Sequence, residues 1–336
     1  MIRAAVFRQS GKPWVIETLP DPEPLAGEAV IRVGRCGICG TDLSKTSGQG
    51  NDFPCGSVLG HEFAGEVVAL GKDADRLKVG DLVTALPVAG CGHCDVCRVG
   101  MQVMCPGLTF YMGGFGEYLR IAERNAVKLP SGLSLADGAL VEPLAVGLHG
   151  VAFARFVPGS RVLVLGAGAI GLATIFWARH LGAGRIVAAS RSTRRADLTI
   201  AMGADAYIVT GEGEAERIRS ALGGPPDYVF EVAGAVGLLS QAIGLARPNG
   251  DVISLGSCMA PDPIVPGIAA YKQVRLSFSR AWTLSEFEHV VDVLDRGHVE
   301  PRAMITATVG LDALPGRIDE LRRPNNETKV HLDPWA

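Results

Sequence analysis

Two patterns of apolar and polar residues divide the chain. Up to about residue 143, short runs rich in Val and Ile, such as 29–33, 66–69 and 81–85, alternate with Gly, Pro and Asp. These runs predict a mainly β domain with many turns. From residue 144 onward, an apolar strand is followed by a turn and a longer helical stretch, and this unit repeats. The alternation predicts a parallel sheet covered by helices on both faces.

The alternating region and the residues after it contain several individual elements. We expect strands at 161–165, 185–189, 207–209, 228–232 and 252–255, and helices at 169–181 and 194–202. After residue 282 the pattern changes again. Thr283 and Glu286 have the spacing of a capping box, which predicts a helix that ends before Gly297. A strand expected at 305–309 fits the β domain better than the parallel sheet.

Composition adds limits on location and partners. The chain has 336 residues, enough for two domains, and 48% of them are hydrophobic. A formal net charge of −3 gives no electrostatic reason to expect nucleic acid or an anionic membrane as a partner. No continuous apolar run approaches the ~20 residues of a membrane span, and no signal-peptide core precedes Gly11. Eight cysteines at metal-like spacings favour a reducing cytoplasm over a secreted disulfide scaffold.

A glycine-rich turn joins the first strand of the alternating region to its first helix. The strand at 161–165 runs directly into Gly166-Ala-Gly168-Ala-Ile170-Gly171. In dinucleotide-binding folds the first glycine makes the turn, the second admits a pyrophosphate, and the third lets the helix pack against the strand. The context predicts dinucleotide binding by Gly166, Gly168, Ile170 and Gly171. The alternative is a tight turn without a ligand.

The end of the second strand indicates which dinucleotide binds. An NAD site has a carboxylate there that holds the ribose hydroxyls. This chain has Ser190 and Arg191 instead, followed by Arg195, and no acidic residue precedes Asp197. Because guanidinium groups bind phosphate through paired hydrogen bonds, these residues favour NADP(H), with NAD(H) as the second choice. The alternative is a solvated basic helix start, which the helix dipole disfavours.

Two groups of residues have the side chains of metal ligands. The first group contains four closely spaced cysteines, Cys91, Cys94, Cys97 and Cys105. This spacing brings four thiolates to one tetrahedral zinc ion, and a compact cluster of this kind more often stabilises a lobe than performs chemistry. The second group lies upstream, in Cys36-Gly-Ile-Cys39-Gly-Thr41-Asp42 and Gly60-His61-Glu62. Taken alone, Cys36 and Cys39 also fit a redox pair, although no thioredoxin-like context surrounds them.

Together with the glycine-rich turn, these motifs make the chain resemble the zinc-dependent medium-chain alcohol dehydrogenase superfamily. The branch is similar to the polyol, sorbitol and threonine dehydrogenases, and the resemblance covers essentially the whole chain. It implies an α/β fold in which a Rossmann domain, a doubly wound parallel sheet, is inserted in a GroES-like, mainly β catalytic domain. The catalytic domain is expected at 1–143 and 283–336, and the Rossmann domain at 144–282.

The resemblance also implies a set of metal ligands. Cys39, His61 and Glu142 would hold a catalytic zinc, and Glu62 would be an alternate ligand. Glu142 stands where classical alcohol dehydrogenases have Cys, and it would bind the metal directly or through a water. Asp42 would fix the His61 ring. The cysteine cluster would hold a second, structural zinc, so two zinc ions per chain are expected.

A mechanism follows from the same resemblance. Zinc would lower the pKa of the alcohol hydroxyl, and hydride would pass to the nicotinamide. Thr41 would relay the hydroxyl proton outward. Many family members have a His three positions after this Thr, whereas this chain has Ser44, so the outer relay residue is left open.

The expected function is reversible oxidation of a secondary alcohol or polyol with NADP(H), in a homodimer or homotetramer. Two alternatives stay open. One is an NAD-linked dehydrogenase of the threonine or sorbitol type. The other is a non-catalytic protein that binds zinc and NADPH, and it would contain one zinc per chain instead of two. A zinc-free quinone or enoyl reductase lacks Cys39, His61 and Glu142 as a set.

Overall fold

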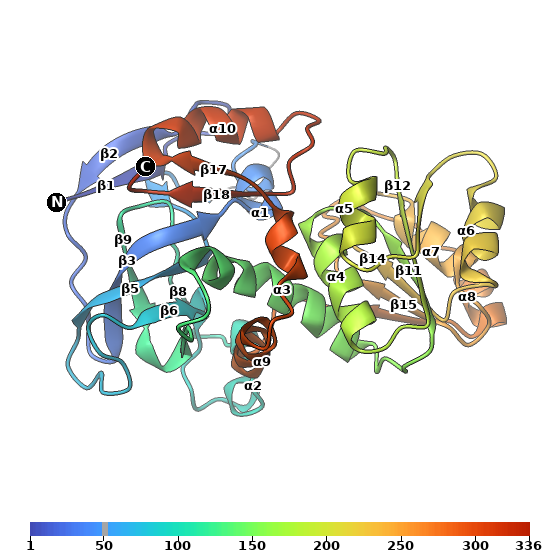
Figure 1. Cartoon of the computed structure of the whole chain (residues 1–336), viewed down its shortest axis with the longest axis horizontal. Helices are drawn as coiled ribbons and strands as arrows, with labels where there is room; N and C mark the ends of the chain where they lie inside the picture. Colours follow the sequence, from blue (N-terminus) through green and yellow to red (C-terminus); the bar gives the residue numbers. More distant parts are fainter. Residues whose placement is uncertain (49–52) are drawn as a thin grey trace. The chain divides into compact units, whose positions relative to one another are not determined.

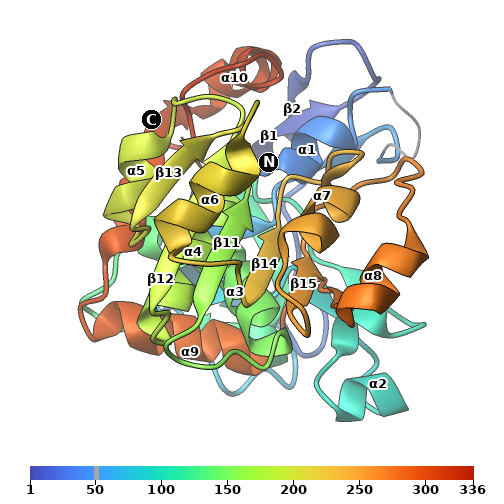
Figure 2. The same ribbon diagram turned by 90° about the vertical axis from the view of Figure 1, so that its right-hand side faces the viewer.

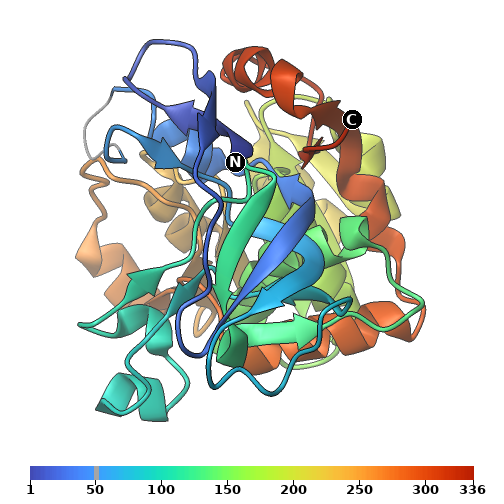
Figure 3. The same cartoon turned by 90° about the vertical axis from the view of Figure 1, so that its left-hand side faces the viewer.

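The computed structural model describes residues 1–48 and 53–336, which form two compact units (Figure 1). The first unit comprises Met1–Glu142 and Trp282–Ala336, and the second comprises Pro143–Ala281. The chain therefore leaves the first unit after Glu142 and returns to it at Trp282. Both termini, marked N and C in Figure 3, belong to the first unit.

The first unit consists mainly of β-strands. Its largest sheet has seven strands in the order β10-β6-β5-β3-β18-β17, with β9 also paired to β3. A three-stranded sheet has the order β2-β1-β4, and β7 pairs with β8. The strand bounds are β1 Ile2–Phe7, β2 Val15–Leu19, β3 Glu28–Gly37, β4 Ser57–Val58, β5 Glu62–Leu70, β6 Leu82–Ala85, β7 Val88–Ala89, β8 Thr109–Phe110, β9 Tyr118–Ala122, β10 Ala126–Lys128, β17 Ile305–Gly310 and β18 Lys329–Asp333.

The long strands β3 and β5 form the centre of this unit. They pair antiparallel from Ala29 opposite Leu70 to Gly37 opposite Glu62. Their inward-facing residues, including Ile31 and Phe63, are almost completely buried in the core. Because β5 begins at Glu62, the end of this pairing places the His61–Glu62 segment beside the end of β3.

Helices of the first unit are short except for α9. Their bounds are α1 Gly40–Ser44, α2 Asp95–Arg98, α9 Leu284–Asp295 and α10 Leu314–Leu321. The predicted capping box of α9 is present, because the Thr283 hydroxyl accepts from the Glu286 amide and the Glu286 carboxylate accepts from the Thr283 amide. The strand expected at 305–309 belongs to this unit. It nevertheless pairs parallel, with β18.

The second unit is built around a six-stranded parallel sheet with the order β13-β12-β11-β14-β15-β16 (Figure 2). The strand bounds are β11 Arg161–Leu165, β12 Arg185–Ser190, β13 Ala206–Val209, β14 Tyr228–Glu231, β15 Asp251–Ser254 and β16 Arg275–Phe278. The helices are α4 Ala169–His180, α5 Ala196–Ala201, α6 Glu214–Leu222, α7 Leu238–Leu245 and α8 Pro266–Lys272.

Both faces of this sheet are covered. Leu163 and Leu165 of β11 pack in one core cluster with α6 and α7, and the intervening Val162 and Val164 are fully buried on the other face. Strands buried on both faces read as continuous apolar runs, which is why β11 could be predicted from the sequence. The predicted fold class, a doubly wound parallel sheet inserted in a mainly β domain, is confirmed.

The helix α3, Leu135–Phe153, has no counterpart among the predicted elements. Its length and mean hydropathy of 1.2 suit a membrane span, but 78% of that window is buried inside the protein, as in the core helix of a globular domain. Asp137, Glu142 and Pro143 interrupt the apolar residues, so no continuous run marks the helix in the sequence. Glu142 therefore lies in the middle of a helix.

Candidate active site

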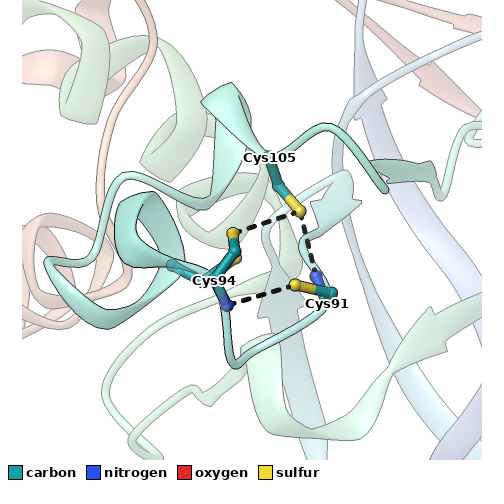
Figure 4. Close-up of side chains that lie close together, drawn as sticks. Cys91, Cys94 and Cys105 are labelled. Atoms are coloured by element: carbon teal, nitrogen blue, oxygen red, sulfur yellow. Dashed lines mark hydrogen bonds between the residues drawn. The ribbon is translucent and has the colours of Figure 1, made fainter.

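The four cysteines of the predicted structural zinc site converge at the start of α2. Figure 4 shows three of them, Cys91, Cys94 and Cys105. Their sulfur atoms all lie within 4.8 Å of one another, and none is in a disulfide. Four sulfurs bound to one zinc at about 2.3 Å lie about 3.8 Å apart. The Cys94 and Cys105 sulfurs are 3.7 Å apart. The sulfur positions thus fit a tetrahedral zinc ion.

Backbone amides donate hydrogen bonds to these sulfurs. The amides of Cys91 and Gly107 donate to the Cys105 sulfur over 3.2 and 3.3 Å. The backbone N–H groups of His93 and Cys94 lower the pKa of Cys91 to about 6. The Cys97 backbone N–H lowers the pKa of Cys94, but burial and the neighbouring thiols outweigh it and raise that pKa to about 12. Because the thiolate is the form that binds metal, Cys91 would bind zinc without losing a proton near neutral pH, and Cys94 would release its proton on binding. Gly90 leaves room for the cluster, since a Cβ there would lie 2.4 Å from the Cys97 sulfur.

A second group of ligand types lies beside the pairing of β3 and β5. One ligand atom from each of Cys39, His61 and Glu62 lies within 4.8 Å of the other two. Cys39 is the N-cap of α1, and its sulfur accepts from the Thr41 amide over 3.4 Å. Sulfur, imidazole and carboxylate are the ligand set of catalytic zinc sites, so these residues fit that metal.

Asp42 lies behind this group and contacts two of its members. It is fully buried, its Oδ2 accepts from the Cys39 amide over 2.9 Å, and its Oδ1 lies 3.5 Å from His61 Nδ1. In the described part of the chain, neither Oδ1 nor Nδ1 has a hydrogen bond to another group. Burial lowers the pKa of His61, but the negative charges of Asp42 and Cys39 outweigh it and raise that pKa well above the usual value. Because Nδ1 faces Asp42, Nε2 is available as a ligand.

Glu62 is paired with a lysine that the sequence analysis did not include. Lys329 Nζ lies 2.7 and 2.6 Å from the two carboxylate oxygens of Glu62, and both side chains are buried. The same nitrogen donates to the Ile38 carbonyl over 3.3 Å. Gly37 gives the carboxylate its space, because a Cβ there would lie 2.1 Å from Glu62 Oε2.

Glu142 is outside the group formed by Cys39, His61 and Glu62. It is buried, and its Oε1 accepts a hydrogen bond of 2.8 Å from the indole nitrogen of Trp282. Burial raises the pKa of Glu142 to about 7, and the charge of Glu62 acts in the same direction. The structure thus places Glu62, the alternate residue of the sequence analysis, nearer to Cys39 and His61 than Glu142.

The two residues of the predicted proton relay lie in α1. Thr41 and Ser44 are both exposed. The Ser44 hydroxyl donates to the Thr41 carbonyl over 3.3 Å, so it caps the helix turn and its proton is engaged. The outer member of the relay stays open, as in the sequence analysis.

The glycines of the predicted dinucleotide site have three different environments. Gly166 has φ +118°, which glycine adopts readily. A Cβ on Gly171 would lie 2.2 Å from the Gly166 carbonyl, whereas a Cβ on Gly168, the N-cap of α4, would meet nothing within 4 Å. The open space at Gly168 and the helix N-terminus form a cradle that fits a pyrophosphate.

A pocket of about 790 Å³ continues from this cradle. It is lined by Gly166 and Gly168, by Ser190, Arg191 and Arg195, and by residues after β13 and β14. Ile170 and Gly171 do not line it, so their contribution is to the α4 turn. No acidic residue stands at the end of β12, where Ser190 is half-buried and Arg191 is exposed.

Comparison with known proteins assigns the family. Residues 25–131 match the alcohol dehydrogenase GroES-like domain, and residues 169–296 match the zinc-binding dehydrogenase domain. The sorbitol dehydrogenase of Bacillus subtilis is 34% identical over 265 residues, which cover 76% of this chain and 75% of that protein. This chain belongs to the zinc-dependent medium-chain alcohol dehydrogenase superfamily, in its sorbitol and polyol branch.

Solved structures of this superfamily share the fold and contain both dinucleotides. RspB of Escherichia coli CFT073, solved with NADH, has a TM-score of 0.92 and 26% identity over 99% of each chain. A zinc-binding dehydrogenase of Sinorhizobium meliloti 1021, solved with NADP, has a TM-score of 0.90 and 30% identity over 99% of each chain. Membership therefore supports an NAD(P)-dependent alcohol dehydrogenase and leaves the choice of dinucleotide to the pocket residues.

In this member of the superfamily, several residues that the sequence analysis missed surround the two sites. Lys329 and Trp282 hold the two glutamates, while Thr210, Glu214 and Gln241 line the dinucleotide pocket. Thr210 and Glu214 follow β13, whereas Gln241 lies in α7, Lys329 begins β18 and Trp282 lies between β16 and α9. None belongs to a spaced motif. For Thr210 and Glu214 the sequence signal was indirect, because chain segments after parallel strands meet at one edge of the sheet.

Proposed function

We propose that the protein is a zinc-dependent dehydrogenase that reversibly oxidises a secondary alcohol or polyol with NADP⁺. The observation that carries the proposal is the convergence of Cys39, His61 and Glu62 within 4.8 Å, with Glu142 also buried in the same unit. The relationship to a sorbitol dehydrogenase supports a polyol as the substrate class. We further propose two zinc ions per chain, one at this centre and one at the four cysteines.

For the carboxylate of the catalytic centre we favour Glu142, with Glu62 as the alternate ligand. Lys329 binds both oxygens of Glu62 and neutralises its charge, whereas Trp282 binds only one oxygen of Glu142. Of the two glutamates, Glu142 is therefore the one that keeps a carboxylate oxygen without a hydrogen bond to another described residue, and this oxygen would reach the metal directly or through a water. Binding through a water agrees with the position of Glu142 outside the closely spaced group.

The residues of the chain have separate roles in this mechanism. A bound zinc would act as a Lewis acid that lowers the pKa of the alcohol, and NADP⁺ would accept the hydride. Asp42 Oδ1, which lies 3.5 Å from His61 Nδ1, would orient the ring electrostatically and leave Nε2 for the metal. Thr41, two residues after Cys39, would take the hydroxyl proton and pass it to water, because the Ser44 hydroxyl is already engaged.

The NADP(H) preference rests on Ser190, Arg191 and Arg195. All three line the pocket, and the site has no carboxylate at the end of β12 that would repel a phosphate. The double variant Ser190→Asp/Arg191→Ala should raise the ratio of kcat/KM for NAD⁺ over NADP⁺ by about 10-fold or more, since a charge-assisted phosphate contact contributes about 1.5–3 kcal/mol. Arg194→Ala is the control, because Arg194 does not line the pocket. An unchanged ratio in the double variant would contradict the preference.

An NAD-linked sorbitol-type dehydrogenase is the second candidate. It is favoured by the NADH complex of the structural relative RspB. Initial rates with NAD⁺ and NADP⁺ over a panel of secondary alcohols and polyols separate the two candidates. A kcat/KM that is higher with NAD⁺ for every substrate would favour the second.

We also propose a homodimer or homotetramer in the cytoplasm. Association is supported by exposed apolar residues around the edge strand β16, where Phe278 is 65% and Tyr271 is 93% exposed. A reducing compartment is supported by the eight cysteines, all of which are free thiols. Light scattering on the purified protein measures the assembly, and a monomer at micromolar concentration would contradict it.

A further inference from the structure

Trp282 is the first residue of the chain after it returns from the second unit, and Glu142 is the last before it leaves. These two residues, 140 positions apart, form a buried hydrogen bond of 2.8 Å between the indole N–H and Glu142 Oε1. Trp282 is 4% exposed and Glu142 is 7% exposed. Because water cannot reach it freely, the carboxylate depends on this donor.

The surroundings fix the Trp282 ring in place. It packs edge-on against Phe287 of α9, with ring centroids 5.4 Å apart and an interplanar angle of 79°. The Thr283–Glu286 capping box follows directly and holds the start of α9. Ala281, just before the ring, has φ +64°, a conformation that residues with a Cβ rarely adopt. Such outliers persist where the surrounding structure holds them, and they cluster at functional sites.

The hydrogen bond gives the two carboxylate oxygens of Glu142 different environments. Oε1 is bound by a neutral donor, which brings no opposite charge to the group, and Oε2 is left for another partner. Glu62 is the contrasting case, because Lys329 binds both of its oxygens and balances its charge. The two glutamates thus differ in their hydrogen-bond donors: a neutral indole binds one oxygen of Glu142, and an ammonium group binds both oxygens of Glu62.

We propose that Trp282 is a positioning residue of the metal centre: its indole N–H orients Glu142 so that Oε2 serves the metal bound by Cys39 and His61. This inference rests on the proposed function, since it requires a metal at that centre. Residues that orient metal ligands typically contribute 10- to 100-fold to metal affinity. Loss of the indole N–H should therefore weaken the catalytic metal and leave the four-cysteine site unchanged.

The test is Trp282→Phe in the full-length protein, with binding of Zn²⁺ and Co²⁺ as the readouts. We expect a loss of about 10- to 100-fold in affinity for one of the two zinc ions, measured by competition with a chromogenic chelator. The visible absorption bands of Co²⁺ at the weaker site should also shift, because they report ligand geometry. Trp335→Phe is the matched control: its indole donates over 2.7 Å to the Val33 carbonyl in the same unit, and we expect no change in either readout.

A second substitution covers the case in which Trp282→Phe does not fold. Replacement of Trp282 by benzothienylalanine keeps the bicyclic shape and removes only the N–H donor, and it should give the same loss. Unchanged Zn²⁺ affinity and an unchanged Co²⁺ spectrum in a folded variant would overturn the role of Trp282. If the wild-type protein itself binds only one zinc, the proposed function fails instead, so the two failures are distinguishable.

Discussion

Lys329 places its ammonium nitrogen 2.7 and 2.6 Å from the two carboxylate oxygens of Glu62, and the two side chains are 2% and 1% exposed. Burial lowers the pKa of Lys329, but the charge of Glu62 outweighs it and raises that pKa above the usual value. Lys329 is therefore charged at neutral pH, and its ammonium group faces the Glu62 carboxylate. Removing one partner of a fully buried ion pair strongly destabilises a protein, because the other charge stays buried and unpaired. Replacing both partners together changes the stability much less.

Lys329→Met should destabilise the metal-free protein by about 3–5 kcal/mol, because it leaves the Glu62 charge buried and unpaired. The double variant Glu62→Gln/Lys329→Met should recover most of that loss. Urea unfolding of the chelator-treated protein measures both free energies. Equal losses in the single and double variants would show that the ion pair itself contributes little.

Cys97→Ala should lower the zinc content from two ions per chain to one, because three thiolates remain at the structural site. The variant should also unfold at a lower temperature, since a structural zinc contributes directly to folding. Elemental analysis and thermal unfolding provide the two readouts. Cys258→Ala is the control, as Cys258 lies outside the group of four, and it should retain two zinc ions. Two zinc ions in the Cys97 variant would contradict the assignment.

Gly171→Ala should weaken dinucleotide binding. The added Cβ would lie 2.2 Å from the Gly166 carbonyl, so the turn beneath the pyrophosphate must move. Overpacking of this size costs about 1–3 kcal/mol, which corresponds to an increase of about 5- to 150-fold in the dissociation constant if the strain is relieved in the unbound protein. Calorimetric titration with NADPH measures the dissociation constant. Gly244→Ala in α7, where a Cβ meets nothing within 4 Å, should leave binding unchanged. A similar affinity in both variants would count against the predicted cradle.

His331 should make the protein sensitive to acid. It is fully buried in β18, and burial, with the positive charges of Lys329 and Arg35, lowers the pKa of His331 to about 3. The unfolded chain takes up a proton at this residue near pH 6.5, about its unperturbed pKa, whereas the folded chain does not. The contribution to stability is therefore complete above about pH 6.5 and is lost as the pH falls toward 3, by about 1.4 kcal/mol per pH unit.

His331→Gln removes the titrating group, so its free energy of unfolding should fall less steeply between pH 6 and 4, by about one proton. Urea unfolding across this pH range gives the slope. His298→Gln, at an exposed position, should keep the wild-type slope. An identical slope for the His331 variant would mean that the folded state protonates this residue as readily as the unfolded chain.

The features that could be predicted from the sequence are those encoded locally. The turn from Gly166 to Gly171, the capping box at Thr283 and the strand β11 each depend on residues within a few positions, and the structure contains all three. The superfamily and the fold class could be predicted because several such local motifs occur together. The convergence of Cys39 with His61 followed only from the resemblance, since their separation carries no periodic signal.

The partners of the two glutamates could not be predicted. Lys329 lies 267 residues from Glu62, and Trp282 lies 140 residues from Glu142. Their contacts depend on the return of the chain to the first unit and on the pairing of β18 with β3. The helix α3 was missed for a different reason, because Pro143 and the acidic residues conceal a segment that tertiary packing holds helical.

The most direct test of the account is metal-dependent turnover. The purified protein is assayed for NADP⁺ and NAD⁺ reduction with a panel of secondary alcohols and polyols, first zinc-replete, then after chelation, and finally with Zn²⁺ restored. We predict turnover of at least one alcohol, its loss when the zinc at Cys39 and His61 is removed, and its return on restoration. A folded protein with two zinc ions that oxidises no alcohol, or turnover that persists after both zinc ions are removed, would contradict a zinc-dependent alcohol dehydrogenase.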